Sequence, residues 1–447
     1  MKISMKNTGL AGLIGAATLA MIEPASAQDA AAASGVSAET GYIFNTFSFL
    51  IHGALVMWMA AGFAMLEAGL VRSKNVATIL LKNVALFAAA GIMYYLVGYN
   101  LMYAGVDGGW IGSFGIWGAD DAAALAGDYS AGYASTSDWF FQMVFVATAA
   151  SVVSGTVAER IKLWPFMIFT VVLTSVLYPI TGSWQWGGGW LAEMGFYDFA
   201  GSTLVHSVGG WAALTGAIIL GARKGKFGAD GSVHPMPGSN LTLATIGTMI
   251  LWLGWFGFNG GSQLAMSTAG DVIAIANIYA NTSMAAAGGV IAAMILTQIL
   301  YKKVDLTMAL NGALAGLVSI TAGPDTPSIG AAIIIGAIGG ILVVIAVPLV
   351  DKCKIDDVVG AVSVHLVCGI WGTLAVPITN ADVSFGVQLT GVVAIGAFTL
   401  VTSAIVWLVL KFTVGLRLSE EDEALGTDAA ELGLEAYPEF GKGSQRF

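Results

Sequence analysis

The chain has 447 residues, of which 57% are hydrophobic and only 10% are charged. This composition excludes a water-soluble domain, because one aqueous fold could not hide so many apolar side chains in its core. The sequence therefore predicts a polytopic membrane protein, and the formal net charge of -10 has to be located along the chain before it carries meaning.

The first 27 residues have the pattern of a targeting segment. Lys2 and Lys6 precede an apolar stretch from Leu10 to Ile22, and Ala25-Ser26-Ala27 stands before Gln28. A basic start, an apolar centre and small residues at the end are typical of a cleavable signal peptide. We therefore expect a signal peptide over 1–27 and a membrane domain over 28–416.

Eleven apolar stretches follow that are long enough to cross a bilayer as helices. They cover about 43–70, 76–104, 139–158, 163–182, 203–222, 240–260, 271–300, 306–322, 328–349, 358–379 and 386–414. The predicted fold class is thus an all-α membrane protein with eleven transmembrane helices.

The basic residues give the orientation of these helices, since cytoplasmic loops are enriched in Lys and Arg. They follow every second stretch, whereas loops 105–138, 183–202, 261–270, 323–327 and 380–385 contain none. Lys82 and Lys411 stand near cytoplasmic helix ends, where we expect them to snorkel. The mature N-terminus is therefore predicted outside, and the acidic tail 417–447 is predicted in the cytoplasm, either solvated or as a docking site.

The outer loops carry acids instead. A negative field of this kind would concentrate cations at an entrance, although charge segregation alone also leaves outer loops acidic. The acids are Asp107, Asp120, Asp121, Asp128, Asp138, Glu193, Asp198, Asp325 and Asp382.

One spacing occurs twice. Asp198-x7-His206-x3-Gly210 opens the fifth stretch, and Asp357-x7-His365-x3-Gly369 opens the tenth. A repeat after five spans requires an inverted second copy, which divides the domain into repeats over about 43–222 and 240–379 plus an eleventh helix over 386–414. Eight residues of helix put each imidazole about 12 Å inside its aspartate, so both rings are predicted near the middle of a ~30 Å core.

Each of these residues also has a purely structural interpretation. A single histidine in an apolar helix is usually a hydrogen-bonded packing residue, which is what we expect of His52, whereas His234 falls in a cytoplasmic loop. The duplicated frame favours a functional pair at His206 and His365, because polar groups inside membranes are costly and mark pathways. An aspartate before a helix is often an N-cap, which we expect for Asp357 and leave open beside a functional role for Asp198.

Several motifs point to one family. The stretch "DFAGSTLVHSVGGWAAL" (198–214) occurs together with "AGLVRSKN" (68–75), "GTVAERI" (155–161), "WGGGWL" (186–191), "GWFGFNGGS" (254–262), "SVHLVCGIWG" (363–372) and "GLRLSEEDE" (415–423). In this order they closely resemble the ammonium transporter family (Amt, Mep and Rh proteins), in particular its bacterial Amt branch. The likeness covers essentially the whole mature chain, and Ser202 replaces a common glycine.

The resemblance implies a homotrimer in the bacterial inner membrane, with a pore through each subunit. It implies ammonium recruitment by Phe145, Trp186 and Ser262, a hydrophobic gate of Phe145 and Phe258, a proton relay through His206 and His365, and a supporting acid at Asp198. It further implies roles for Trp255 and Tyr178 in the vestibule of the pore.

The predicted function is therefore ammonium transport, in which the cation loses its proton outside and ammonia crosses with or without that proton. The alternative is an ammonium sensor that signals through its tail, and the resemblance implies docking of a PII-type signalling protein on the cytoplasmic face. A Rh-like gas channel or cation-coupled carrier fits less well, because Trp186 preserves a cation site. Lacking a nucleophile-base set, metal-ligand spacing or a phosphate loop, the sequence predicts no enzyme, cofactor or nucleic-acid partner.

Overall fold

The computed structural model describes residues 36–440, and the predicted signal peptide over 1–27 lies outside them. Within 36–440 the regular structure is helical, apart from the isolated bridges Ile161–Arg417 and Phe227–Val233. The all-α fold class is confirmed.

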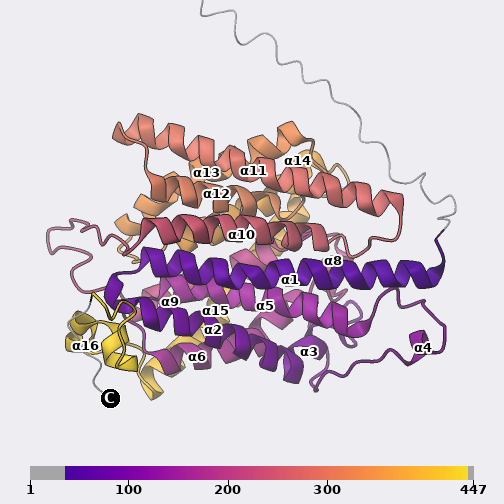
Figure 1. Ribbon diagram of the computed structural model, residues 1–447, viewed down its shortest axis with the longest axis horizontal. Helices are drawn as coiled ribbons and strands as arrows, with labels where there is room; N and C mark the ends of the chain where they lie inside the picture. The colour runs from indigo at the N-terminus through magenta and orange to yellow at the C-terminus, as the bar shows by residue number, and fades with distance from the viewer. Residues whose placement is uncertain (1–35, 441–447) are drawn as a thin grey trace, which may run out of the picture. The chain divides into compact units, whose positions relative to one another are not determined.

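The first half of the bundle contains five membrane-length segments (Figure 1). Its elements are α1 (Ala38–Leu70), η2 (Ser73–Asn75), α2 (Val76–Met93), η3 (Tyr94–Gly98), α3 (Tyr99–Tyr103), α4 (Ala122–Leu125), α5 (Ser135–Thr156), α6 (Leu163–Val172), η4 (Leu173–Leu177), α7 (Tyr178–Ser183), α8 (Trp190–Glu193), η5 (Ser202–Ser207) and α9 (Val208–Leu220).

The second half repeats this arrangement and adds a last long helix. Its elements are α10 (Leu241–Gly261), α11 (Ala269–Tyr301), α12 (Leu306–Ile320), α13 (Ile329–Lys352), η6 (Val362–Val367), α14 (Cys368–Thr379), α15 (Phe385–Thr413), α16 (Glu420–Leu425) and η7 (Asp428–Leu432). Within 36–440, ten helical segments are long and apolar enough to span a membrane, and α12 is a shorter apolar helix of 15 residues. The eleven predicted stretches correspond to these eleven segments.

Side chains before the helices fix where several of them begin. The Asn240 side chain accepts a hydrogen bond from the Leu243 amide, and Thr268 forms a reciprocal capping box with Asp271. Such caps satisfy backbone N–H groups that have no partner within the helix. The tenth span begins at Val362 rather than at 358, because Gly360 turns the chain with φ +82°.

Close backbone contacts pack the long helices together. Helix α1 lies along α10 (Figure 1), and a Cβ atom at Gly69 would be 2.5 Å from the backbone nitrogen of Ala244. In the other half, Gly289 of α11 faces the backbones of both α12 and α13 at Gly312 and Gly340. Small residues are what allow membrane helices to approach this closely.

Lys82 corrects one sequence expectation. It does not snorkel to a helix end but is 2% exposed, with Nζ donating to the Ser154 carbonyl at 3.0 Å and lying 4.2 Å from the centroid of the Phe166 ring. Beside it, the buried Glu67 carboxylate accepts hydrogen bonds from Asn83 (2.8 Å) and Ser154 (3.0 Å). The lysine faces α5 and α6 across the bundle, an orientation that its position in the sequence does not specify. Lys411, by contrast, is exposed and donates to the Ile219 carbonyl.

The basic end of the bundle holds a buried ionic network. Arg223 contacts the Asp356 carboxylate at 2.8 Å and Glu159 at 3.3 Å, and Arg72 contacts Glu159 at 2.6 Å. Burial opposes ionisation of Asp356, but the Arg223 hydrogen bonds and the nearby Arg160 lower its pKa to about 2. Because this pKa is lowered, the stabilisation is complete above pH about 4 and is lost as the pH falls through about 2.

The described part of the tail, up to residue 440, contacts the same end of the bundle. The Glu423 carboxylate accepts from Arg417 and from the Lys224 amide, each at 2.6 Å. The Asp428 carboxylate accepts from the amides of Ala77 and Thr78 at the start of α2. The described part of the tail is thus neither free in solvent nor independently folded, and it packs on its own helix-end loops.

We predict that Asp356→Asn destabilises the protein by about 3 kcal/mol, because it leaves the buried Arg223 guanidinium with only one carboxylate. The thermal unfolding midpoint in detergent measures this. Lys224→Gln is the matched control, since the exposed Lys224–Glu420 pair is expected to contribute less than about 1 kcal/mol. Equal midpoints for the two variants would contradict the importance of the network.

Candidate functional site

The two histidines of the repeated frame meet inside the bundle. His206 Nδ1 lies 3.2 Å from His365 Nδ1, and the ring planes are 28° apart. With both nitrogens Nδ1, a hydrogen bond requires one ring to donate and the other to accept. The exposed fraction is 0% for His206 and 3% for His365. The sequence prediction that oppositely oriented repeats bring these rings together agrees with this geometry.

Reciprocal glycine contacts permit that approach. A Cβ atom at Gly210 would lie 2.7 Å from Leu366 Cβ, in the residue after His365. A Cβ atom at Gly369 would overlap the Ser202 carbonyl oxygen and lie 2.5 Å from Ser207 Oγ, in the residue after His206. Gly210 therefore packs against η6, which carries His365, and Gly369 packs against η5, which carries His206. This reciprocal contact is what a pseudo-two-fold relation between the halves requires.

Both histidines stand on π-helical turns. His206 lies in η5 and His365 in η6, and each turn continues into an α-helix. A π turn adds a residue to the helical ladder and is frequent at functional sites, because it displaces side chains from regular register. The two rings that meet inside the bundle are thus both carried on π turns.

The aspartates of the frame hold the starts of these turns. Asp198 accepts from four amides, Gly201, Ser202, Thr203 and Leu204, at 2.8–3.1 Å. Burial raises the pKa of Asp198 to about 6, while these hydrogen bonds oppose the rise.

Asp357 has the corresponding contacts on the other half. It accepts from the Ala361 amide at 3.1 Å, from the Val362 amide at 2.8 Å and from the Thr156 hydroxyl at 2.9 Å. The expected capping role of Asp357 is therefore confirmed.

The three residues expected to recruit a cation line one cavity of about 320 Å³. The Phe145 and Trp186 rings are perpendicular with centroids 6.2 Å apart, and Ser262 Oγ donates to the Phe258 carbonyl at 2.8 Å. The Trp186 indole N–H donates to the Asp198 backbone carbonyl at 2.9 Å. Asp198 thus contacts the wall of this cavity through the backbone hydrogen bond from Trp186, while its carboxylate faces the first amides of η5.

Two stacked phenylalanines lie between this cavity and the histidines. The Phe145 and Phe258 rings stack with centroids 4.0 Å apart, and the Phe258 centroid is 5.2 Å from that of His206. The Trp255 ring stacks on the His206 ring with centroids 4.9 Å apart, and its indole N–H donates a hydrogen bond to the Thr321 hydroxyl. Tyr178 is buried but does not line the cavity.

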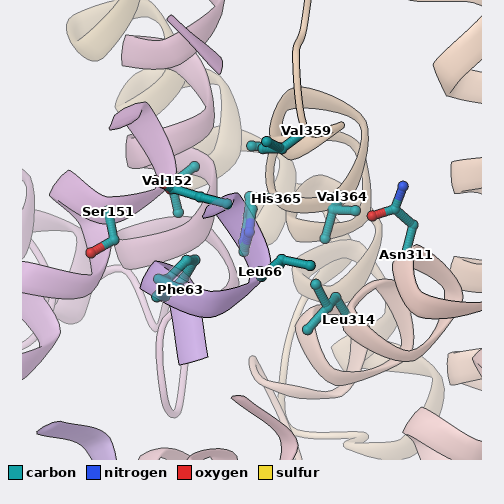
Figure 2. A pocket seen from close by; sticks show the side chains of 11 residues that line it. Phe63, Leu66, Ser151, Val152, Asn311, Leu314, Val359, Val364 and His365 are labelled. Carbon is teal, nitrogen blue, oxygen red and sulfur yellow. The ribbon is translucent and has the colours of Figure 1, made fainter. Parts of the chain in front are cut away.

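A small chamber lies beside His365 (Figure 2). Figure 2 shows the His365 ring between Phe63, Ser151 and Val152 on one side and Val364, Leu314 and Asn311 on the other. The chamber volume is about 20 Å³, enough for one water-sized molecule. Its polar lining comes from Glu67, Ser151, Asn311 and His365.

The chamber borders a wider cavity at the basic end of the bundle. Asn311 and Val359 line both the chamber and this cavity of about 440 Å³, which also has Asp351, Asp357 and Lys226 in its walls. The cavities therefore form a row, in which the Phe145–Phe258 pair and the two histidines separate one end from the other.

Sequence reasoning missed two carboxylates in this row. Asp138 lines the cavity of Trp186, but the sequence places it only among outer-loop acids. Glu67 lines the chamber of His365 and was not singled out. The available signal for Glu67 was a charged residue within an apolar stretch, which is rare in membranes and marks function or pairing.

Eleven helical segments around a row of cavities define a membrane channel or carrier. The chain belongs to the ammonium transporter family, whose model matches residues 47–437. It is 40% identical to a putative ammonium transporter of Synechocystis sp. over 96% of this chain and 97% of that one. It is 41% identical to the ammonium transporter Amt2 of Archaeoglobus fulgidus, over 88% of this chain and 87% of that one.

Solved structures agree with this assignment. A structure titled as a sensor Amt protein matches with a TM-score of 0.82 and 36% identity, over 88% of this chain and 99% of that one. The crystal structure of Candida albicans Mep2 matches with a TM-score of 0.78 and 26% identity, over 92% of this chain and 94% of that one.

We predict that Gly369→Ala lowers ammonium uptake at least about tenfold, because a methyl group at this crossing must push η5 and η6 apart. Gly386→Ala is the control, since its nearest neighbouring heavy atom would be 3.7 Å away. Uptake by cells lacking their own ammonium carriers measures both variants. Normal uptake by Gly369→Ala would contradict the view that the tight crossing sets the histidine geometry.

Proposed function

We propose that this protein transports ammonium across the bacterial inner membrane. The single observation that carries the proposal is the contact of His206 and His365 at 3.2 Å, between a cavity with aromatic walls and a chamber for one small molecule. In this proposal, Phe145, Trp186 and Ser262 recruit the cation, Phe145 and Phe258 gate the passage, and the histidines relay protons.

Ammonium fits the outer cavity by its chemistry. It is a small cation with four N–H donors, so the Trp186 and Phe145 faces can attract it and Ser262 can accept a hydrogen bond. Cation-π attraction contributes about 0.5–2 kcal/mol and strengthens as water leaves. Asp198 supports the site by anchoring η5 and presenting the carbonyl that orients Trp186.

The apolar centre of the membrane favours neutral ammonia over the ammonium cation. Moving a bare charge to the bilayer midplane costs at least about 2.5–3.5 kcal/mol. Ammonium therefore loses a proton near the outer site and passes the phenylalanine pair as ammonia, a route closed to potassium, which has no proton to lose. Imidazoles with a reference pKa near 6.5 accept and donate protons readily, which suits His206 and His365 to such a passage.

The family resemblance also supports proposals about processing, oligomeric state, membrane orientation and a partner protein. We propose cleavage after residue 27, a homotrimer with one pore in each subunit, an external mature N-terminus and a cytoplasmic tail that docks a PII-type signalling protein. The concentration of Lys and Arg at one end of the bundle supports this orientation.

We predict that His206→Ala and His365→Ala abolish ammonium transport or admit potassium, because the hydrogen-bonded path is interrupted. Trp186→Leu should mainly raise the apparent KM, by about 2- to 30-fold from the loss of one cation-π contact. Uptake kinetics in a strain without its own ammonium carriers measure these effects. Trp164→Leu, which changes a tryptophan that is 72% exposed at the start of α6, is the control. Unchanged kinetics in all three site variants would remove the site assignment.

A sensor is the second candidate, because the similar solved structure is titled as a sensor Amt protein and the tail of this chain contacts the loops at the helix ends. The two functions separate in purified proteoliposomes. As a transporter, the full chain should take up ammonium, and a chain shortened after residue 418 should retain uptake. Ammonium binding by the full chain without any flux would instead favour the sensor.

A further inference from the structure

The outer cavity contains an ionisable group that has no part in the proposed mechanism so far. Asp138 lies in the first turns of α5, is 7% exposed and lines the same cavity as Trp186, Phe145 and Ser262. Its carboxylate accepts hydrogen bonds from the Tyr99 hydroxyl and from the Gln142 amide, the latter at 3.4 Å.

A capping role does not account for this carboxylate. The N-cap residue of α5 is Ala134, with no side-chain cap, and the hydrogen bonds found for the Asp138 carboxylate go to side chains rather than to the helix amides. The carboxylate is thus held by a tyrosine from α3 and a glutamine one turn along its own helix. These contacts fix its position at the wall of the cavity.

No basic side chain among residues 36–440 forms an ion pair with Asp138. The loops 105–138 and 183–202 also contain no Lys or Arg. Removing a carboxylate from water without a counter-charge is unfavourable, so a cation in the cavity would restore the balance. Glu159, three residues after the end of α5, by contrast pairs with Arg72 and Arg223.

The surroundings of Asp138 suit a small cation. The rings of Tyr99, Tyr133 and Phe141 line the cavity together with Phe145 and Trp186. Aromatic faces attract cations, and the tyrosine oxygens can accept hydrogen bonds from N–H groups. The volume of about 320 Å³ leaves room for an ion together with several waters.

We propose that Asp138 is a cation-binding residue of the outer cavity, where it holds ammonium before the cation reaches the Trp186 face. This inference rests on the proposed transport function and adds a charged ligand to the aromatic site. Asp138 confers selection by charge, since a neutral molecule gains nothing from the carboxylate, whereas Trp186 and Ser262 then bind the partly dehydrated ion.

The test is the kinetics of ammonium and methylammonium uptake by Asp138→Asn in cells lacking their own carriers. We expect the apparent KM to rise about tenfold or more with a maximal rate within about twofold, because a charge-assisted hydrogen bond is lost. Asp120→Asn is the matched control, since it removes the same charge from an exposed outer-loop residue. Its KM should stay within about twofold of the wild type.

Three outcomes would overturn the inference. Equal KM values for Asp138→Asn, Asp120→Asn and the wild type would show that the carboxylate binds no cation, and equal increases in both variants would assign the effect to the general field. A lower maximal rate with unchanged KM would make Asp138 structural.

Asp138→Glu keeps the charge and guards against misfolding, and it should restore most of the affinity lost in Asp138→Asn. Ammonium-dependent thermal stabilisation of the purified protein reports binding without flux. A wild type that binds ammonium but does not transport it would therefore refute the proposed function alone.

Discussion

The close crossing of η5 and η6 is the constraint on which the rest of the structure depends. Because Gly210 and Gly369 carry no side chains, the two broken helices approach until His206 and His365 touch. Polar groups in an apolar interior are costly without partners, and the Nδ1 atom of each ring supplies one to the other. The aspartate caps, the π turns and the stacked Trp255 all serve to hold two imidazoles in one place inside an otherwise apolar bundle.

Charge is handled differently at the two ends of the bundle. At the basic end, Glu159 and Asp356 are paired with arginines, and the tail carboxylates of Glu423 and Asp428 are satisfied by loop and helix-start groups. At the other end, Asp138 faces a cavity without a counter-charge from the described residues. The carboxylates at the basic end are thus neutralised by arginines or satisfied by amide groups, whereas the Asp138 carboxylate forms no ion pair with a described residue.

Much of this architecture could be predicted from the sequence, because hydropathy indicates which stretches are long and apolar enough to span a membrane. The two histidines could be identified from the sequence because their spacing from an aspartate and a glycine is repeated. The aromatic residues could be identified because their motifs resemble those of a family. The sequence does not predict that Lys82 is buried, that Glu67 lines the chamber or that Asp138 faces a cavity. These features depend on which face of a helix meets which neighbour, and a uniformly apolar helix gives no periodic signal for that face.

The chamber beside His365 bears on how many molecules can pass at once. A space of about 20 Å³ admits one water-sized particle. In the proposed transport, molecules therefore pass His365 one at a time, and a proton crosses this level by way of the histidine rings rather than along a wide column of water.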